Sequence, residues 1–344
     1  MDLRPTDDQR ALRAGTRELL ARRFDRDRLR AAVADPALDR ALWRELGAAG
    51  FFALRLPEAA GGVGLGLPDA VLVFEEAGRA LLPGPLVAGH LLAGTVPGAA
   101  TGERVVGLCD VGAGGGRLWE HPGDCDELIL VEEAEGAAEG AAEGMADEAA
   151  GGGAGAAGQP GAYWNDPAWP VLEPVRSVDP LTPLARVAAF PRRVPRPLDV
   201  PKLRREAALL TAALQLGSAA RTVEAAVEHA GRRVQFGARI GSFQAVKHLC
   251  AEMLIRVEIA RCAVYAASLT ERSRAVIGAK LLADEAAVRN ARDCLQVHGG
   301  MGFTWEADVH LHLKRAWLRA EQWQNAAKAE EALAADLLGD DVAS

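Results

Sequence analysis

The sequence has few aromatic residues and no long apolar run. Phenylalanine, tryptophan and tyrosine together make up 5% of its 344 residues. No apolar stretch approaches the roughly 20 residues that a helix needs to cross a bilayer. The charged N-terminus, Met1 to Pro5, also lacks the apolar segment of a secretion signal. We therefore expect a cytoplasmic protein with no membrane partner.

Cysteine pairs and an excess of basic charge are also missing. The five cysteines are scattered and include no C-x-x-C pair, which argues against a disulfide framework or a structural zinc site. H-E-x-x-H is absent as well, and we expect no metal site. Acidic residues outnumber basic ones by 47 to 39, so the net charge of −8 argues against a nucleic-acid partner.

Most of that negative charge belongs to one low-complexity segment. Residues 132–162 consist almost entirely of Ala, Gly and Glu, and their seven acidic residues have no lysine or arginine among them. Without these seven, the net charge would be −1. Such a composition cannot bury much surface. We expect a solvated loop, with an acidic interaction segment as the alternative.

The chain divides into three parts by pattern. Residues 1–100 predict an all-α domain, in which Thr6 and Gln9 form a capping box, a helix covers residues 38–49, and Asp69 caps a later helix. Residues 101–200 predict a reduced β domain interrupted by the low-complexity segment. Residues 201–344 predict a four-helix bundle.

The expected elements of the last two parts can be placed from local patterns. Short β-branched runs bounded by Gly or Pro indicate strands at 104–110, 127–133, 171–178 and 185–190. Apolar steps of three and four indicate helices from 201 onward, from a cap at Ser242, over 275–297 and over 308–338.

Two short stretches of the bundle carry chemistry. In the first, R-x-Q-F-G-x-x-I-x-x-F-Q at residues 233–244, a turn brings together a guanidinium, an aromatic ring and two carboxamides. Arginine binds phosphate oxygens in a bidentate manner. In the second, Q-x-H-G-G-x-G-F-T-W-E at residues 296–306, three glycines allow close approach of the backbone to a ligand. The alternative interpretation is that both stretches are ordinary turns between helices and bind no ligand.

Together these stretches resemble the C-terminal half of the acyl-CoA dehydrogenases. Residues 43–50 and 56–62 are similar to the "ELG…G…PE..GG.G" segment of the same family. The resemblance covers nearly the whole chain except roughly 111–200. It implies the family fold: an N-terminal helical domain, a central β domain and a C-terminal four-helix bundle. It also implies an FAD cofactor and α,β-desaturation of an acyl-CoA substrate.

The resemblance also implies roles for individual residues. In the family, the arginine of R-x-Q-F-G contacts the FAD pyrophosphate held by a neighbouring subunit, a role that falls on Arg233. The remaining expected contacts with FAD, at its adenine end and across the interface, are Phe236, Gln244, Gln296, Gly299 and Gly300. His298 and Gly302 lie near this contact without an assigned role.

The match fails at the catalytic base. The segment that packs on the flavin ring in the family is not found between Leu108 and Pro183. No Tyr-Glu-Gly-Thr segment follows the glycine motif, where residues 318–324 read LRAEQWQ. The position of the alternative family base, on the helix before R-x-Q-F-G, holds Ala207. Glu206 is the one weak candidate, and because one residue rotates a helix by about 100°, we expect it to point elsewhere as a solvated residue.

Three functions remain open. The chain resembles the degenerate subunit of heteromeric, steroid-degrading members, so it would lend the adenine and pyrophosphate half of an FAD site to a catalytic partner subunit. It could instead be a self-sufficient homo-oligomeric dehydrogenase with Glu206 or another acid as base. It could also be a non-catalytic scaffold that has lost the flavin. A bulky or steroid-derived acyl group is expected by analogy alone.

Overall fold

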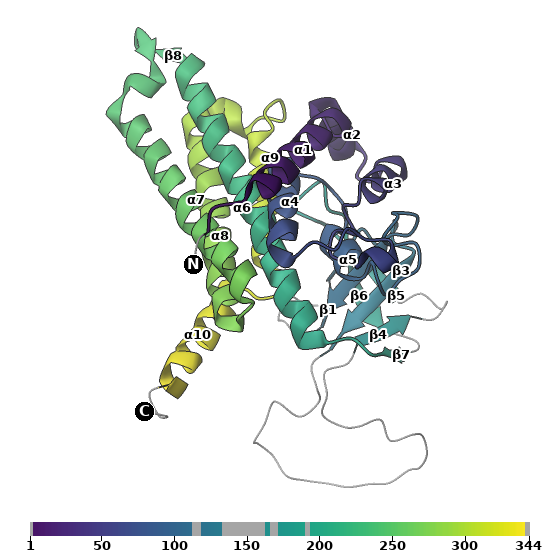
Figure 1. Cartoon of the computed structure of the whole chain (residues 1–344). Coiled ribbons are helices and arrows are strands. Elements are labelled where there is room, and N and C mark those ends of the chain that lie inside the picture. Colours follow the sequence, from purple (N-terminus) through teal and green to yellow (C-terminus); the bar gives the residue numbers. More distant parts are fainter. Residues whose placement is uncertain (1–2, 112–117, 133–161, 166–170, 190–192, 341–344) are drawn as a thin grey trace, which may run out of the picture.

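The computed structural model describes residues 3–111, 118–132, 162–165, 171–189 and 193–340 (Figure 1). Apart from its two end residues, the low-complexity segment that we expected to be a solvated loop lies outside them. In this part of the chain, no helix combines the length and the apolarity needed to span a membrane. All five cysteines are free thiols, and three of them are buried.

The N-terminal region is helical, as predicted. Its elements are α1 (Asp7–Arg23), α2 (Arg26–Ala34), α3 (Arg40–Ala48), η1 (Glu58–Ala60), α4 (Leu67–Arg79) and α5 (Leu86–Leu91). The capping box at the start of α1 is confirmed. The Gln9 backbone N–H donates to Thr6 Oγ1 at 3.2 Å, and the Thr6 N–H donates to Gln9 Oε1 at 3.1 Å.

The start of α4 differs from the prediction. Asp69 does not precede the helix but occupies its third position, where its carboxylate accepts from the Gly66 N–H at 2.9 Å. The helix begins earlier, at Leu67, because Pro68 is compatible with the first helical turn, where a backbone N–H has no partner in any case.

The central region contains two small sheets. One has the order β1-β3-β4-β7 and the other β2-β6-β5. In the first, β1 and β3 are parallel and the other pairs are antiparallel. The strands are β1 (Val106–Asp110), β2 (Leu118–Glu120), β3 (Glu127–Val131), β4 (Ala162–Asn165), β5 (Val171–Val175), β6 (Leu184–Ala189) and β7 (Arg193–Arg196). The four predicted strands correspond to β1, β3, β5 and β6, whereas β2, β4 and β7 were not predicted.

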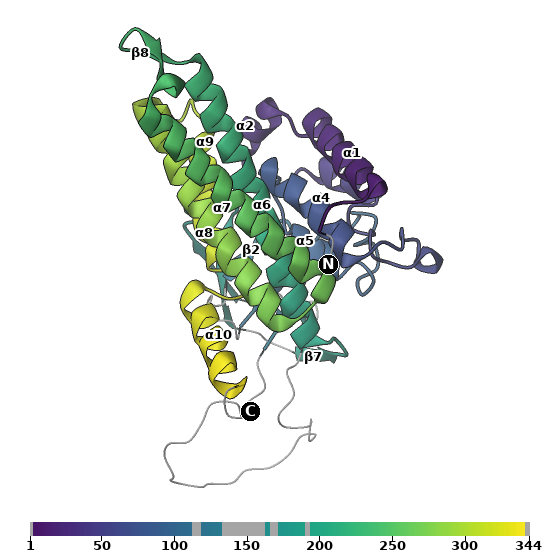
Figure 2. The ribbon, with the colours of Figure 1, turned by 60° about the vertical axis from the view of Figure 1, so that its left-hand side comes forward.

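The C-terminal region is the predicted helical bundle. Figures 1 and 2 show its three long helices running side by side, joined by short turns at their ends. The elements are α6 (Val200–Arg232), β8 (Val234–Gln235), β9 (Ala238–Arg239), η2 (Ile240–Ser242), α7 (Gln244–Thr270), α8 (Ser273–His298), η3 (Gly299–Phe303), α9 (Val309–Ala320) and α10 (Ala326–Asp340). The order of a helical, a β and a bundle region is therefore confirmed, while the limits at 100 and 200 stay predictions.

Two details of the bundle were predicted wrongly. Ser242 does not cap α7, because it lies in η2 and its hydroxyl donates to the Arg239 carbonyl at 2.7 Å. The single helix expected over 308–338 is two helices, α9 and α10. The break passes through Trp323, whose φ of 64° is left-handed. No Gly or Pro marks this break in the sequence.

Helix α6 is the central element of the bundle and packs closely on α4. A Cβ atom on Gly78 would lie 2.0 Å from the Leu214 carbonyl oxygen, and one on Gly217 would lie 1.8 Å from the Glu75 carbonyl oxygen. Only glycine fits at either position, since both neighbours are backbone atoms. These two glycines fix the N-terminal region against the bundle.

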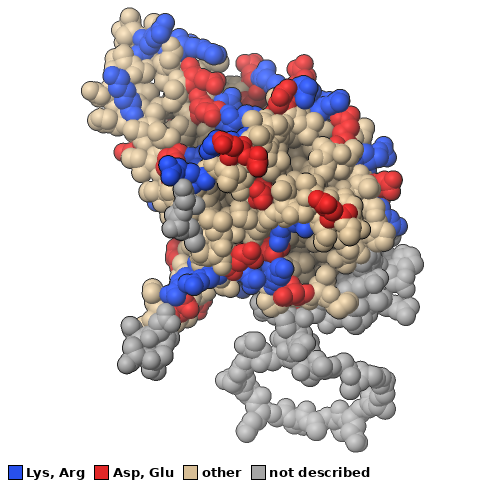
Figure 3. All heavy atoms as spheres, in the orientation of Figure 1, with Lys and Arg blue, Asp and Glu red and all other residues tan. Residues whose placement is uncertain are grey.

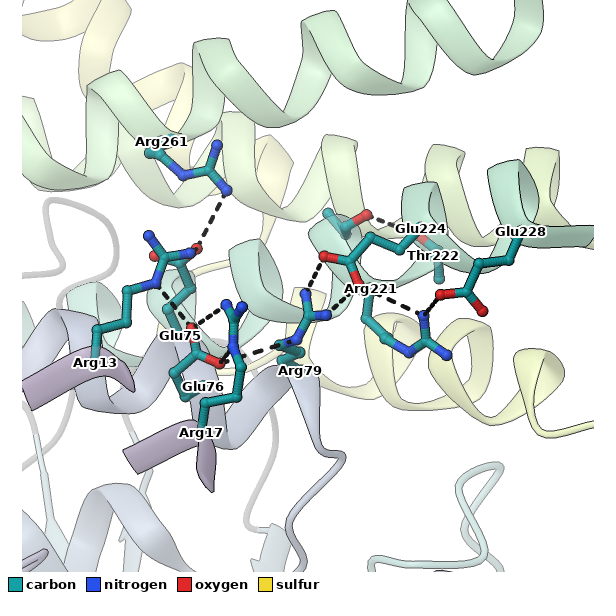
Figure 4. A network of polar contacts seen from close by, with 11 residues as sticks. Arg13, Arg17, Glu75, Glu76, Arg79, Arg221, Thr222, Glu224, Glu228 and Arg261 are labelled. Carbon is teal, nitrogen blue, oxygen red and sulfur yellow. Dashed lines mark hydrogen bonds and ion pairs between the residues drawn. The ribbon is translucent and has the colours of Figure 1, made fainter. Parts of the chain in front are cut away.

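A buried ion network reinforces this contact (Figure 4). Glu76 of α4 accepts from Arg17 at 2.7 Å and from Arg13 at 2.8 Å, both on α1. Glu75, also on α4, accepts a hydrogen bond of 2.6 Å from the hydroxyl of Tyr265, which lies on α7. We call this cluster the waist network; its members are Arg13, Arg17, Glu75, Glu76, Arg79, Arg261 and Tyr265.

Candidate cofactor-binding site

The first motif forms a hairpin at one end of the bundle, which we call the tip (residues 229–244 and 296–306). Strands β8 and β9 pair through Val234 with Arg239 and Gln235 with Ala238. The two residues between them, Phe236 and Gly237, both have positive φ, at 51° and 77°. This backbone matches the twist of a tight hairpin but is disfavoured for a residue with a side chain. It holds the Phe236 ring outward with 93% of its surface exposed.

The polar members of this motif are exposed beside the ring. Arg233 directly follows α6 as its C-cap, where its backbone N–H donates to the His229 carbonyl at 2.8 Å. Its guanidinium is exposed and has no hydrogen bond or ion pair with any residue that the structure describes. Gln244 is the first residue of α7 and is also exposed. A guanidinium without a side-chain partner among the described residues, a ring and an amide are therefore all exposed at this end of the bundle.

The second motif ends the helix next to it. Gln296 is exposed in the last turn of α8, and His298 is the last residue of that helix. Gly299 then adopts a φ of 62°, which turns the chain into η3. Neither Gly299 nor Gly300 would bring a Cβ within 4 Å of another atom, so their surface side is open. A ligand could approach the backbone here.

The end of α6 that leads into the first motif is in direct contact with the second motif. The rings of His229 on α6 and His298 on α8 stack with centroids 4.2 Å apart and planes inclined by 26°. Figures 1 and 2 both place the ends of α6 and α8 at the same end of the molecule. The structure therefore brings the two stretches predicted to contact FAD to the same end of the bundle. On the face shown in Figure 3, the outer part of this end carries basic side chains.

The loop after η3 is fixed from the N-terminal region. Arg26 of α2 pairs with Asp308 at 2.5 Å, and Arg30 reaches the same carboxylate at 2.6 Å. Next to this clamp, Phe303 and Trp305 remain 70% and 60% exposed. The amino-acid pattern gave no sign of the clamp, because the arginines lie more than 270 positions away in the chain.

Glu206 is not the solvated residue that we expected. Its side chain is buried, with 6% of its surface exposed, and it accepts two hydrogen bonds from Arg55 at 2.7 and 2.9 Å. Lys202 lies 3.9 Å away. Ala207, at the position of the family base, is fully buried. The ion pair with Arg55, 151 positions earlier, occupies both carboxylate oxygens.

A cleft lies far from the tip, where the sheets, α5 and the end of α9 meet; we call it the junction cleft. Its apolar wall includes Leu86, Leu184 and Leu214, and its polar groups include Glu120, Arg319 and Glu321. Burial, together with the charge of Arg315, lowers the pKa of Arg319 to about 9. Glu321 is exposed, and its carboxylate has no hydrogen bond or ion pair among the described residues.

The tip lies at the C-terminal end of α6, whereas the junction cleft touches the middle of this helix. Leu214 lines the cleft and Arg233 ends the helix, so 19 residues of helix, or about 28 Å, separate them. Among the described residues, no group of three His, Cys, Asp or Glu side chains could hold a metal ion.

Comparisons with known proteins agree with this architecture. The N-terminal domain model of the acyl-CoA dehydrogenases matches residues 6–103, and their C-terminal domain model matches residues 205–322. The acyl-CoA dehydrogenase IpdE2 of Mycobacterium tuberculosis is 34% identical over 325 residues, which cover 91% of this chain and 92% of IpdE2. The IpdE2 of Mycolicibacterium smegmatis is 33% identical over 90% and 93% of the two chains.

Solved structures share the fold. Butyryl-CoA dehydrogenase from Megasphaera elsdenii superposes with a TM-score of 0.80 over 98% of this chain and 100% of that one, at 18% identity. A chain of the ChsE4–ChsE5 complex from Mycobacterium tuberculosis gives 0.79 over 98% and 99%, at 21% identity. The chain thus belongs to the acyl-CoA dehydrogenase family, a family of oxidoreductases.

Proposed function

We propose that this chain is a subunit of an FAD-dependent acyl-CoA dehydrogenase that desaturates an acyl-CoA thioester between its α and β carbons. In this proposal the chain holds the adenine and pyrophosphate half of an FAD whose flavin ring lies in a catalytic partner subunit. The observation that carries the proposal is the free, exposed guanidinium of Arg233 at a tip about 28 Å of helix away from the junction cleft of the same chain.

The tip residues fit a dinucleotide. A diphosphate accepts paired hydrogen bonds from a guanidinium, and Arg233 has its donors free among the described residues. The exposed Phe236 ring offers a flat apolar surface for adenine, and the exposed amides of Gln244 and Gln296 can donate to or accept from a base edge. The open side of Gly299 and Gly300 admits a close backbone contact.

The rest of this chain supports a binding role over a catalytic one. FAD, when bound, supplies the acceptor for the hydride that leaves the β carbon. Removal of the α proton needs a carboxylate within hydrogen-bond reach of that proton. Glu206 is held by Arg55, and Ala207 cannot act as a base. In this proposal the partner subunit supplies the base, and this chain binds and orients the cofactor.

Flavin content tests the proposal directly. The chain would be purified alone and after co-expression with a second acyl-CoA dehydrogenase-like subunit, and flavin would be measured per mole of chain. We expect a colourless protein alone and a yellow complex that dehydrogenates an acyl-CoA. Stoichiometric FAD and turnover in the chain alone would refute the proposal, and a colourless complex would favour the scaffold without flavin.

One observation favours a second candidate, a self-sufficient enzyme. Glu321 lines the junction cleft and its carboxylate has no partner among the described residues, so a carboxylate is available there. If the chain alone is active, Glu321→Gln should abolish turnover with FAD retained, whereas Glu206→Gln should act mainly on stability through Arg55. The reverse result would make Glu206 the base.

The acyl group is proposed from the relatives alone. One solved structure that shares this fold, at a TM-score of 0.78 and 24% identity, is described as a steroid acyl-CoA dehydrogenase of two components, Tcur3481 and Tcur3483. We propose a bulky, steroid-derived acyl-CoA as the substrate of the complex. Comparing the turnover of such a thioester with that of butyryl-CoA would test this, and equal turnover would contradict it.

A further inference from the structure

The stacked pair His229 and His298 has no role in the function proposed so far. It lies between the ends of α6 and α8 and is a ring contact between the helix end before the first motif and the second motif. Both rings are half-buried, so they are neither core residues nor free surface side chains. Arg233 lies four residues after His229, and its backbone N–H bonds to the His229 carbonyl at 2.8 Å.

One ring has a defined tautomer. His298 Nδ1 lies 2.8 Å from the Cys294 carbonyl oxygen, which can only accept a hydrogen bond. Nδ1 therefore carries the hydrogen in the neutral ring, and Nε2 has the lone pair that can take up a proton. Protonation of this ring keeps the bond to Cys294 and adds a donor on Nε2.

The charged groups near the pair are cationic, apart from Asp293, which is paired with Arg256. Burial, followed by the charges of His298 and Arg233, lowers the pKa of His229. The Cys294 thiol lies 3.7 Å from His298 Nδ1, and burial raises its pKa to about 12, so it stays neutral. Other groups acting on Cys294 are Cys250 of α7, Asp293 of α8 and Arg221 of α6. Asp293 is itself paired with Arg256.

We propose that His229 and His298 form, together with Arg233, a site for a diphosphate group, and that one of the two imidazoles takes up a proton when the diphosphate binds. This inference rests on the proposed function, since the diphosphate would belong to the dinucleotide. The physical reason is that two stacked imidazoles beside a guanidinium oppose a further positive charge, and a diphosphate placed there removes that opposition.

The proposal has a defined pH dependence. Binding an anion raises the pKa of the imidazole that contacts it, so the bound state holds more protons than the free state near neutral pH. Affinity for the diphosphate should therefore rise as the pH falls from 8 to 6. A rise of one pKa unit corresponds to about a tenfold gain in affinity across that range.

Histidine NMR resonances of the full chain, titrated from pH 8 to 5.5 with and without inorganic pyrophosphate, test the proposal. We expect pyrophosphate to raise the titration midpoint of His229 or His298 by about 0.5–1 unit, and to leave His90, which is buried away from the tip, unmoved. Arg233→Ala should remove the effect. Unmoved midpoints for both tip histidines would overturn the inference.

Two variants distinguish the protonation of the histidine rings from their role in packing. His229→Phe keeps an aromatic ring in the stack, and His298→Asn keeps a donor for the Cys294 carbonyl, while each removes a titratable nitrogen. We expect both to fold and to flatten the pH dependence of pyrophosphate binding. If flavin content of the co-expressed complex depends on Arg233 but neither histidine affects its pH dependence, the proposed function stands and this inference fails.

Discussion

The waist network and the tip use the same residue types in opposite ways. At the waist, Glu76 has only 1% of its surface exposed and two arginines bind it. At the tip, Arg233 is exposed and its guanidinium has no partner among the described residues. Charge at the waist is compensated within the chain, whereas we propose that the charge of Arg233 at the tip is compensated by a ligand. Under the proposed function, the arginines of the waist stabilise the fold and Arg233 binds a ligand.

The same contrast holds for aromatic side chains. Tyr265 at the waist is buried, and its hydroxyl donates to Glu75. Phe236 at the tip is exposed on a backbone conformation that costs free energy. Because this backbone conformation costs free energy and leaves the Phe236 ring exposed, we infer that the ring contacts another molecule. The predictions below test whether the waist affects only stability and the tip only binding.

The largest effect is expected at the waist. Glu76→Ala removes the carboxylate that Arg13 and Arg17 share and leaves a cavity between α1 and α4. We expect the free energy of unfolding to fall by about 3 kcal/mol, as measured by urea denaturation. Glu18→Ala, on the exposed side of α1, is the matched control and should change it by less than about 0.5 kcal/mol. A loss of the same small size for both variants would contradict the structural role.

The buried bundle should also show a pH-dependent stability. Burial, followed by the charges of Arg221 and Arg315, lowers the pKa of His312 to about 3. Below about pH 6.5, His312 becomes protonated in the unfolded chain but stays neutral in the folded one. The free energy of unfolding therefore decreases as the pH falls. This amounts to about 1.4 kcal/mol per pH unit for one proton.

Urea denaturation of the wild type and of His312→Asn between pH 6 and pH 5 measures this slope. The free energy of unfolding of the variant should fall less steeply with pH, by the slope that corresponds to about one proton. His90, whose pKa burial lowers to about 4, contributes in the same direction and remains in both proteins. Parallel slopes would show that His312 accepts a proton in the folded state.

At the tip the effect should fall on binding alone. Arg233→Ala removes charge-assisted hydrogen bonds worth about 1.5–3 kcal/mol, which corresponds to a roughly ten- to hundredfold loss of FAD affinity in the complex. Its unfolding free energy should stay within about 0.5 kcal/mol of the wild type. The control Arg22→Ala, an exposed arginine of α1, should change neither quantity. Flavin retention after dialysis and urea denaturation report the two effects separately.

The smallest expected effect is a gain in stability, whereas most substitutions reduce stability. Phe236→Gly relieves the left-handed backbone at φ 51°, so the free energy of unfolding should rise by about 0.5–1 kcal/mol. The same variant should retain flavin less well, because the ring is gone. Phe236→Ala keeps the strained backbone, so it should lose flavin retention with no gain in stability. A ring with no ligand role would give unchanged flavin retention in both variants.

The sequence predicted much of the fold because local patterns determine it. The capping box at Thr6 and the apolar periodicity of the bundle depend only on neighbouring residues. The predictions failed where the decisive partner is distant or the signal is unusual. Glu206 is buried because Arg55 approaches from another region, and the chain breaks at Trp323 without a glycine or proline.

The candidate site shows the same limit. The resemblance of two motifs to a known family picked out Arg233, Phe236 and Gln244, and the structure brings the end of α6 that precedes them next to the end of α8 that carries Gln296, Gly299 and Gly300. The stack of His229 on His298 could not be predicted, since it depends on the packing of α6 against α8. His298 was noticed as part of the motif, but no pattern in the sequence pointed to His229.

A structure of the flavin-loaded complex tests the central claim most directly. It would be determined with this chain and the catalytic subunit purified together. The account predicts that the Arg233 guanidinium lies within hydrogen-bond distance of the pyrophosphate of an FAD whose flavin ring is held by the partner subunit. An FAD bound wholly within one chain, with Arg233 facing solvent, would contradict it.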